Sequence, residues 1–489
     1  MTADRRPHFQ VTFTLLALAG IAYALVQSLV APALPDIQLA LNTSVDSVTW
    51  VMTAYLLSAS IATPLIGRFG DTRGKKQVLV VVLVVFCIGT GVSALANSLA
   101  VMLIGRVAQG AAGGIFPLAF GIIRDEFPRA RVAGGIGLMS ALMGVGGGAG
   151  VVLAGPIVER VSYHYLFWLP LLVLVPVTLA VQLVVPESPI RVPGRVNWAG
   201  AALMSLGLSC VLLAVSQSRV WHWLSLRTFG LLAIGIVFLV AWVRNETRSA
   251  EPLVDMRMMR IRGVWTTNAV AFLLGFGMYS SFLLVPEFVE TPKDVGFGAS
   301  VTDAGLFLVP ATTAMLLFGA QTGRLERRFG SRPPLVAGAL AATMSYLLLA
   351  FQRDDPWEVY VATTLFGAGT GLAFAAMVNL IIENVGAAET GIATGMNTVT
   401  RMVGGAFGGS ITASILAATV GADGYASSSG FTAAFGALAL AVACGALIAL
   451  AIPQSRPGDA FVAHGVGDVP VSVAAALMTE RERTPERSR

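Results

Sequence analysis

Charged residues are scarce in this sequence, and their scarcity limits the class of protein. Only 12% of the 489 residues are Asp, Glu, Lys or Arg, whereas an average soluble domain carries about 25%. Apolar residues make up 55% of the chain, and the mean hydropathy is +0.76. This composition excludes a soluble globular protein and predicts a polytopic membrane protein in contact with lipid.

Metal-binding and catalytic side chains are also few. The 3 cysteines lie in apolar runs, and the 4 histidines form no ligand pattern. We therefore expect no disulfide framework, no metal and no cofactor. Because the chain lacks the clustered acids or histidines of a membrane enzyme, we expect no enzymatic activity. The net charge of +5 is spread over many short loops, so no nucleic-acid partner is expected.

Fourteen apolar runs approach or exceed the roughly 20 residues that cross a bilayer. Exposed irregular backbone is not tolerated in lipid, so each run should be a helix. The sequence therefore predicts an all-α polytopic fold with spans near 11–31, 48–66, 77–95, 99–123, 132–157, 166–186, 199–217, 227–243, 265–288, 304–322, 334–351, 358–382, 390–418 and 431–452.

The distribution of basic residues predicts the orientation. With the N-terminus inside the cell, 25 of the 32 Lys and Arg fall in cytoplasmic loops or tails. Five fall outside, and Arg106 and Arg401 lie within spans. The positive-inside rule favours this arrangement. We expect a multi-pass protein of the cell membrane with both termini in the cytoplasm.

An internal repeat predicts the domain organisation. Gly67-Arg68-Phe69 recurs as Gly323-Arg324-Leu325, and the glycines at 110, 114, 134, 147 and 148 recur 257 residues later. Six spans fit before residue 190, so two extra spans separate the repeats. The expected parts are a cytoplasmic N-terminus (1–10), a six-helix bundle (11–190), a linker with two helices (191–262), a second six-helix bundle (263–453) and a mostly disordered cytoplasmic tail (454–489).

One charged, glycine-rich connection between two spans carries the clearest motif. It reads Gly67-Arg68-Phe69-Gly70-Asp71-Thr72-Arg73-Gly74-Lys75-Lys76. The segment resembles the G-x-L-A-D-R-x-G-R-K signature of the major facilitator superfamily, with Thr72 in place of the usual Arg. The alternative is an ordinary positive-inside loop. The fourteen-span form and the segment Glu251–Arg257 resemble the multidrug:proton antiporter branch of that superfamily.

The resemblance implies a gate at this connection, which the sequence predicts to be a short loop. Asp71 is expected beside the start of the thirteenth span, near Thr390, where a helix N-terminus favours a carboxylate. Arg73 or Lys75 is expected to reach Asp125. The repeated copy has Arg327 at the position of Asp71, so the gate should be asymmetric. The residues assigned to this gate are Gly67, Asp71, Arg73, Gly74, Lys75, Lys76 and Asp125.

Two arginines lie inside spans. Arg106, Gln109 and Gly110 share one helix face and resemble the R-x-x-Q-G signature of the superfamily's fourth helix. Arg106 either couples protons or substrate or ties the helix to backbone carbonyls of the first span. Arg401 either binds an anionic substrate group or makes a structural contact with backbone carbonyls. Asn397 lies on the same helix face.

The other candidates for a central cavity are polar side chains within spans. The alternative for each is a structural hydrogen bond inside the bundle. Together with the two arginines, the coupling or substrate residues we predict are Gln27, Tyr55, Gln109, Asn268, Tyr279, Asn379 and Asn397.

The fifth span is rich in glycine. It resembles the antiporter signature G-P-x-x-G-G, although Val151 stands where the proline belongs. The alternative is close packing against the eighth core helix. The residues assigned to this antiporter-type helix are Gly144, Gly150, Gly155 and Pro156.

Acidic residues are nearly absent from the middle of the spans. The first span resembles the superfamily pattern L-D-x-T-I-V-N-V-A-L-P, but Val26 stands in place of its aspartate. The resemblance implies that this aspartate serves cationic drugs or protons. Without it, we do not expect the substrates to be purely cationic. Asp36 and Glu287 are the possible proton sites, and the alternative is that both are solvent-exposed loop edges.

These features favour a monomeric secondary transporter whose partners are a small-molecule substrate, protons and membrane lipid. We expect export of small amphipathic compounds driven by proton entry. The alternative is a facilitator or uptake carrier for a specific metabolite, with an anion favoured by the two membrane arginines. The sequence lacks a G-x-x-x-x-G-K-[ST] loop, so ATP is not expected to drive transport directly.

Overall fold

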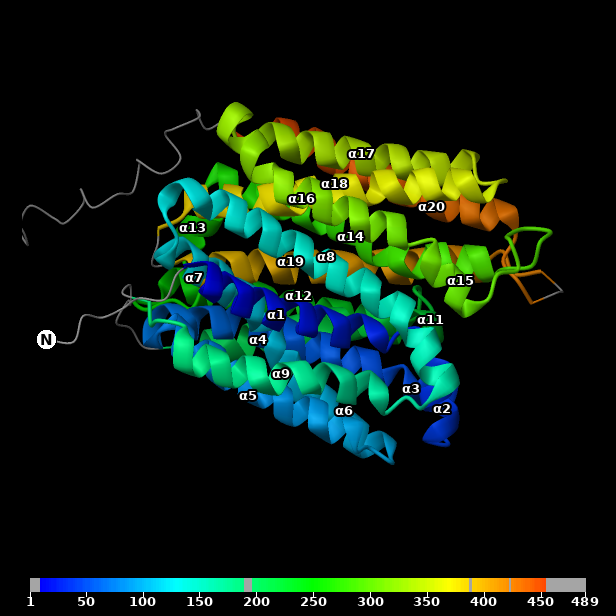
Figure 1. Cartoon of the computed structure of the whole chain (residues 1–489), viewed down its shortest axis with the longest axis horizontal. Helices are drawn as coiled ribbons and strands as arrows, with labels where there is room; N and C mark the ends of the chain where they lie inside the picture. The colour runs from blue at the N-terminus through cyan, green and yellow to red at the C-terminus, as the bar shows by residue number, and fades with distance from the viewer. Residues whose placement is uncertain (1–8, 189–195, 387–388, 422–423, 454–489) are drawn as a thin grey trace, which may run out of the picture.

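The structure, a computed structural model, describes residues 9–188, 196–386, 389–421 and 424–453. The expected tail at 454–489 and most of the expected N-terminal segment lie outside the described residues. The described residues form long helices that run roughly side by side (Figure 1). Apart from an isolated bridge between Val420 and Ala426, this part of the chain contains no β-structure.

The helices of the first half and of the inserted segment follow the predicted spans. They are α1 (Phe9–Leu29), α2 (Leu34–Ala40), α3 (Val45–Val48), α4 (Trp50–Arg73), α5 (Lys75–Ala94), α6 (Leu99–Gly110), the 3-10 turn η1 (Ala111–Gly114), α7 (Ile115–Glu126), α8 (Arg129–Arg160), α9 (Tyr165–Val184), α10 (Trp198–Ser216), α11 (Ser218–Trp221) and α12 (Leu226–Arg248).

The second half repeats the same plan. Its helices are α13 (Met256–Arg260), α14 (Arg262–Glu290), α15 (Val301–Leu306), α16 (Val309–Phe329), α17 (Arg332–Phe351), α18 (Pro356–Asn384), α19 (Thr390–Ala417) and α20 (Ser428–Leu450). Phe9 at the start of α1 contacts Phe127 after α7, and Arg332 at the start of α17 bonds to the carbonyl of Leu450. Both described chain ends therefore lie at the end of the bundle that carries Asp71, called here the Asp71 end.

Thirteen helical segments in the described part of the chain are long and apolar enough to cross a membrane. The one expected span not among them is α19, which is 28 residues long but carries many polar residues. Since α19 packs between α14 and α4, most of its surface faces protein and not lipid. A fourteenth crossing remains a prediction.

The prediction of a short loop at 67–76 is wrong. Helix α4 continues to Arg73, and α5 begins at Lys75, so only Gly74 lies between them. Gly74 has a φ of +116°, a backbone conformation that glycine adopts most easily. The Glu187 carboxylate accepts hydrogen bonds from the amides of Lys76 and Gln77 at 3.1 and 3.2 Å. It therefore caps the N-terminus of α5, where a negative charge is favoured.

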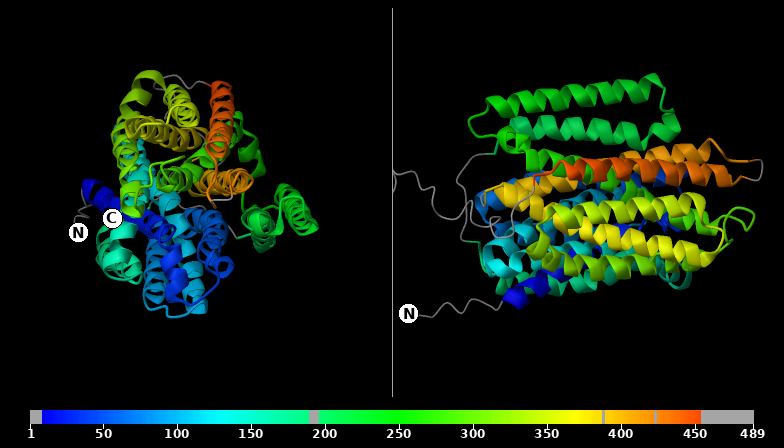
Figure 2. Two further views of the ribbon diagram at one scale, coloured as in Figure 1. Left: turned by 90° about the vertical axis from the view of Figure 1, so that its right-hand side faces the viewer. Right: turned by 90° about the horizontal axis from the view of Figure 1, so that it is seen from above.

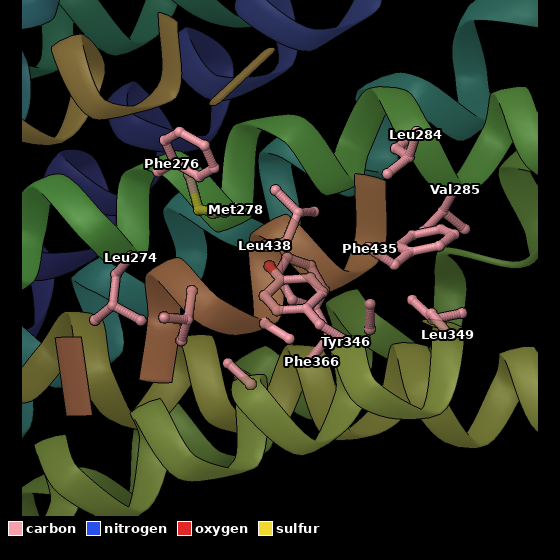
Figure 3. Packing of buried hydrophobic residues seen from close by; sticks show 14 of the residues in the cluster. Leu274, Phe276, Met278, Leu284, Val285, Tyr346, Leu349, Phe366, Phe435 and Leu438 are labelled. Atoms are coloured by element: carbon pink, nitrogen blue, oxygen red, sulfur yellow. The ribbon is translucent and has the colours of Figure 1, made fainter. Parts of the chain in front are cut away.

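Each half has its own hydrophobic core. In the second half, Leu274, Leu284 and Val285 of α14 belong to one cluster with Tyr346 of α17 and Phe435 of α20, and Val285 lies beside Phe435 (Figure 3). In the first half, Tyr23 and Phe116 pack edge to face with centroids 5.8 Å apart. The first-half core also includes Val378 and Ile382 of α18 and Met402 of α19, so the two cores touch where the halves meet.

The two halves meet at two glycine-lined seams that the internal repeat relates. Gly67 of α4 faces Gly391 of α19, and Gly323 of α16 faces Gly134 of α8. A Cβ atom added to Gly323 would lie 2.7 Å from the Cα atom of Gly134. Small residues let helix backbones approach closely in a membrane. The repeated glycines therefore mark the contacts between halves.

The inserted helices α10 and α12 lie as a pair at one side of the bundle (Figure 2). Trp223 donates to the Ser414 hydroxyl at 2.9 Å, and the Ser410 hydroxyl donates to the Val215 carbonyl at 2.8 Å. Both contacts attach the pair to α19. Helix α10 also packs against α4, so the insertion covers the seam between α4 and α19.

Arg353, expected in an outer loop, is buried between helix ends. Its guanidinium donates to the carbonyls of Leu349 and Ala350 at 2.9 and 2.6 Å, and to Ser428 at the start of α20. Burial lowers the pKa of Arg353. A cation is favoured at a helix C-terminus, so this arginine joins α17 to α20.

Candidate functional site

The Asp71 carboxylate lies at the N-terminus of α19, in the other half of the molecule. Its oxygens accept hydrogen bonds from the amides of Gly391 at 3.3 Å and Ile392 at 3.1 Å. The first amides of a helix have no partner within the helix, and a carboxylate there is favoured by about 0.3–1 kcal/mol. Asp71 is buried. It therefore links α4 to α19 across the seam.

Lys75 and Asp125 form a buried ion pair next to Asp71. The Lys75 ammonium lies 2.7 Å from Asp125 and 3.9 Å from Asp71. The Ser188 hydroxyl donates to the same Asp125 oxygen. Arg73 does not reach Asp125; its guanidinium lies over the Phe69 ring at 4.9 Å and is exposed. Of the two expected partners, the structure brings only Lys75 to Asp125.

Arg124, which the sequence analysis missed, contacts the same region of the second half. Its guanidinium donates to the carbonyls of Val385 at 3.1 Å and Gly386 at 3.2 Å, and to the Thr390 hydroxyl. Arg124 and Asp71 together hold the start of α19 from two helices of the first half.

Glu389 immediately precedes α19. Burial, together with nearby Asp255, raises the pKa of the Glu389 carboxyl, and Arg68 acts against this shift. The start of α19 therefore has a second carboxyl group close to it, in addition to Asp71, with Arg68 as the nearby cation.

Arg106 forms a closed set of contacts within the first half. Its guanidinium donates to the Val51 carbonyl at 3.0 Å and to the Gln109 side chain at 2.8 Å, and it lies 4.4 Å from the centre of the Tyr55 ring. Gln109 in turn donates to Thr90 at 3.3 Å. The carbonyl tie is therefore to α4, not to the first span as expected.

Arg401 differs from Arg106 in where its partners lie. Its guanidinium sits 4.5 Å from the centre of the Phe374 ring and 3.9 Å from the sulfur of Met143, which belongs to α8 in the first half. Its Nε atom is buried with no hydrogen-bond partner in the described structure. Neither buried arginine pairs with a carboxylate among the described side chains. Arg401 is therefore the guanidinium that faces the junction of the two halves.

Tyrosine hydroxyls surround the same junction. The hydroxyls of Tyr23, Tyr55 and Tyr279 are buried without a hydrogen bond of acceptable geometry to described residues. Tyr23 lies within reach of Tyr55, and Tyr279 within reach of Arg401, so these groups interact with one another at less than ideal geometry. Leaving a buried polar group unpaired costs about 1–3 kcal/mol. Arg401 and the three tyrosines, called here the central cluster, therefore form a buried group of polar side chains whose hydrogen-bonding capacity is incompletely used.

The predicted amide residues separate into two places. Asn397, one turn before Arg401 on α19, donates to Asn268 of α14 at 2.9 Å. Asn379 instead donates to Glu326 at 2.6 Å, toward the Asp71 end. Gln27 is half-buried on α1. Asn268 and Asn397 therefore extend the central cluster, whereas Asn379 does not.

The glycines of α8 allow two neighbours to approach at once. The Cβ that Gly144 lacks would overlap Met315 of α16, and that of Gly150 would overlap Ser28 of α1. Gly155 is buried, and Pro156 lies inside the helix. Packing against α16, the eighth core helix, explains the glycines on that face.

The two predicted proton sites are exposed. Asp36 lies in the first turn of the short helix α2, and Glu287 lies on α14 one residue after Pro286. Val26, at the position of the expected membrane aspartate, is fully buried. The sequence analysis missed Glu326, a buried carboxylate on α16, because it assigned this stretch to a charged loop.

Solved structures of transporters share this fold. The chain is similar to the human organic anion transporter MFSD10 (TETRAN), with a TM-score of 0.65 at 15% identity over 91% of this chain and 100% of the other. It is also similar to the proton:xylose symporter XylE, with a TM-score of 0.65 at 14% identity over 92% and 96% of the two chains.

The sequence is also similar to curated transport proteins. The Tetracenomycin C resistance and export protein of Streptomyces glaucescens is 27% identical over 80% of this chain and 73% of its own length. The Multidrug transporter protein MdtP of Bacillus subtilis (strain 168) is 27% identical over 80% and 72%. The family model of the Major Facilitator Superfamily matches residues 16–409 and again 267–480. This chain, a transporter and not an enzyme, belongs to the Major Facilitator Superfamily.

Proposed function

We propose that the protein is a secondary active exporter of small amphipathic compounds, driven by proton entry. The substrate would bind at the central cluster, and the halves would rock about it so that the cluster faces one side of the membrane at a time. Asp71 and Arg124 would close the cytoplasmic side by holding the start of α19. The observation that carries this proposal is the group of unpaired, buried polar atoms where the two halves meet.

Two further findings support export. Of the two relatives at 27% identity, one is named as a Tetracenomycin C resistance and export protein and the other as a multidrug transporter. The central cluster combines aromatic rings with few polar groups, which is the usual lining of a site for amphipathic molecules. Tyr23, Tyr55 and Tyr279 supply the rings, and Arg401 supplies the charge.

The second candidate function is a carrier for an anionic metabolite. Arg106 and Arg401 are buried, and no described carboxylate pairs with either. A buried cation without a counter-ion is costly, and an anionic substrate would relieve that cost at Arg401. This candidate differs from the first in substrate charge and in the need for a proton gradient.

Inside-out membrane vesicles test these alternatives. Vesicles containing the protein are given tetracenomycin C or ethidium, a pH gradient is imposed, and accumulation is measured. If the protein is a proton-driven exporter, vesicles with the pH gradient should accumulate several-fold more compound than vesicles without it, and a protonophore should release the accumulated compound. Folded protein that ignores the gradient contradicts the exporter proposal. Downhill uptake of an anionic dye in that case would favour the metabolite carrier.

A further inference from the structure

The proposed function requires a residue that binds and releases the coupling proton. Asp36 and Glu287 are exposed. Besides Asp125, whose buried side chain pairs with Lys75 at 2.7 Å, three acidic residues of the described chain are buried, and two of them are well bonded. Asp71 accepts two backbone amides, and Glu246 accepts from Asn197 and from the Val254 amide at 3.2 Å each. The third is Glu326.

Glu326 is buried with little to stabilise a negative charge. One carboxyl oxygen accepts a hydrogen bond from the Asn379 amide at 2.6 Å, and the other has no hydrogen-bond partner in the described structure. No described cation lies within ion-pair distance of it. Burying an ionised carboxylate without a cation is far more costly than burying the neutral acid.

The groups that face Glu326 from neighbouring elements do not supply such a cation. On its own helix, Arg327 is close but exposed. On α18, Glu383 lies one turn beyond Asn379 and accepts from Ser331, so a second carboxyl group is near. On α8 the contacts are backbone atoms of residues 133–134, and the guanidinium of Arg131 lies over the Phe9 ring at 4.8 Å.

Glu326 also lies at the seam between the halves. The Asn379 amide that it holds is 3.5 Å from the Ala133 carbonyl of α8. One turn before Glu326, Gly323 packs directly on Gly134 of α8. The ionisation of Glu326 is therefore connected, through one amide, to the contact between α16 and α8.

We propose that Glu326 is the proton-binding residue of the transport cycle. This inference rests on the proposed function. While the α16–α8 seam is closed and the opposite end of the bundle is open, the carboxylate takes one proton from hydronium that enters between the halves from that end, and forms a neutral acid. When the halves separate at the Asp71 end, Glu326 meets water, the O–H bond breaks, and the proton passes to that water. Asn379 orients the carboxyl group and links it to the seam.

Infrared titration of the purified full-length protein tests proton binding without any substrate. The C=O band of a protonated carboxyl group is followed from acidic to alkaline buffer in the wild type and in the Glu326→Gln and Glu383→Gln variants. We expect loss of one titrating band in Glu326→Gln only. Retention of that band in Glu326→Gln would overturn the proposal. Glu326→Asp, with a shifted midpoint, serves if the Gln variant does not fold.

A transport assay in the same vesicles separates coupling from translocation. Glu326→Gln should equilibrate tetracenomycin C or ethidium downhill but lose accumulation against the pH gradient, whereas Glu383→Gln should retain it. Full accumulation by Glu326→Gln would overturn the assignment. If the wild type itself ignores the gradient, the proposed function fails, and the infrared titration still decides whether Glu326 binds a proton.

Discussion

Gly67 and Gly391 face each other so closely that neither position has room for a side chain. A Cβ atom on Gly67 would lie 2.5 Å from the Gly391 carbonyl oxygen, and one on Gly391 would lie 2.7 Å from that of Gly67. The contact brings Asp71, one turn further along α4, against the first amides of α19. Close backbone packing and the hydrogen bonds of Asp71 therefore close the Asp71 end together.

Gly391→Ala should open this contact. The added methyl group meets backbone atoms that cannot move independently, and overpacking costs about 1–3 kcal/mol. We expect about a tenfold loss of gradient-driven accumulation with normal folding. The matched control is Gly134→Ala, the equivalent position of the repeat, where a Cβ atom meets nothing within 4 Å. Equal activity of the two variants would show that the Gly67–Gly391 contact does not matter.

Asp71→Asn should weaken closure at the same end. A hydrogen bond to a charged group contributes about 1.5–3 kcal/mol, so loss of the carboxylate shifts the equilibrium toward separation of α4 and α19 by about tenfold. The measurement is the maleimide labelling rate of a single cysteine at the buried Thr394. Asp36→Asn, on an exposed carboxylate, is the control. Unchanged labelling and transport in Asp71→Asn, at wild-type protein levels, would rule out the latch.

Asp125→Asn should destabilise the fold more than it affects transport. The Lys75–Asp125 pair is buried at 2.7 Å, and removing one partner of such a pair costs about 3–5 kcal/mol because the other charge remains buried. Thermal unfolding in detergent should show a large fall in midpoint. The double variant Lys75→Met with Asp125→Leu should recover much of it. If the fall in unfolding midpoint of the double variant equals the sum of the falls in Lys75→Met and Asp125→Leu alone, the two side chains do not interact.

The two buried arginines should respond differently to substitution. Arg106→Lys loses donors to Val51 and Gln109 within the first half, so we expect lower thermal stability. Arg401→Gln removes a guanidinium whose Nε atom has no hydrogen-bond partner in the described structure. We therefore expect near-normal stability, but at least a tenfold change in the ratio of transport rates for acidic and neutral probes. Unfolding curves and uptake of paired dyes measure both effects. If Arg106→Lys changed probe selectivity and Arg401→Gln lowered stability, Arg106 would be the substrate-facing arginine and Arg401 the structural one.

Much of the fold was predictable because its signals are local. Long apolar runs, glycine spacing and basic loops predicted the helices and the repeat, and family resemblance predicted the position of Asp71 beside Thr390. The structure describes a helix through Arg73 where a loop was expected, because polar residues on a helix that faces protein resemble a loop in composition. The sequence alone could not distinguish those two cases.

Burial of individual side chains was the least predictable property. Glu326 and the exposed Arg327 are adjacent in the sequence, and only the rotation of α16 decides which one faces α8 and α18. The partner of Arg106 likewise depends on which helix lies opposite, and α4 occupies that place. Such contacts are set by packing between distant segments.

Distances between the two halves at both ends of the bundle test the account most directly. Spin labels are placed on the exposed residues Arg73 and Arg328 at the Asp71 end, and on Val161 and Trp357 at the opposite end. Distances are measured in lipid with and without a bound substrate probe and at acidic and alkaline pH. We predict that the distance at one end lengthens as the distance at the other end shortens. Distances that stay fixed, or that change together, would contradict alternating access about the central cluster.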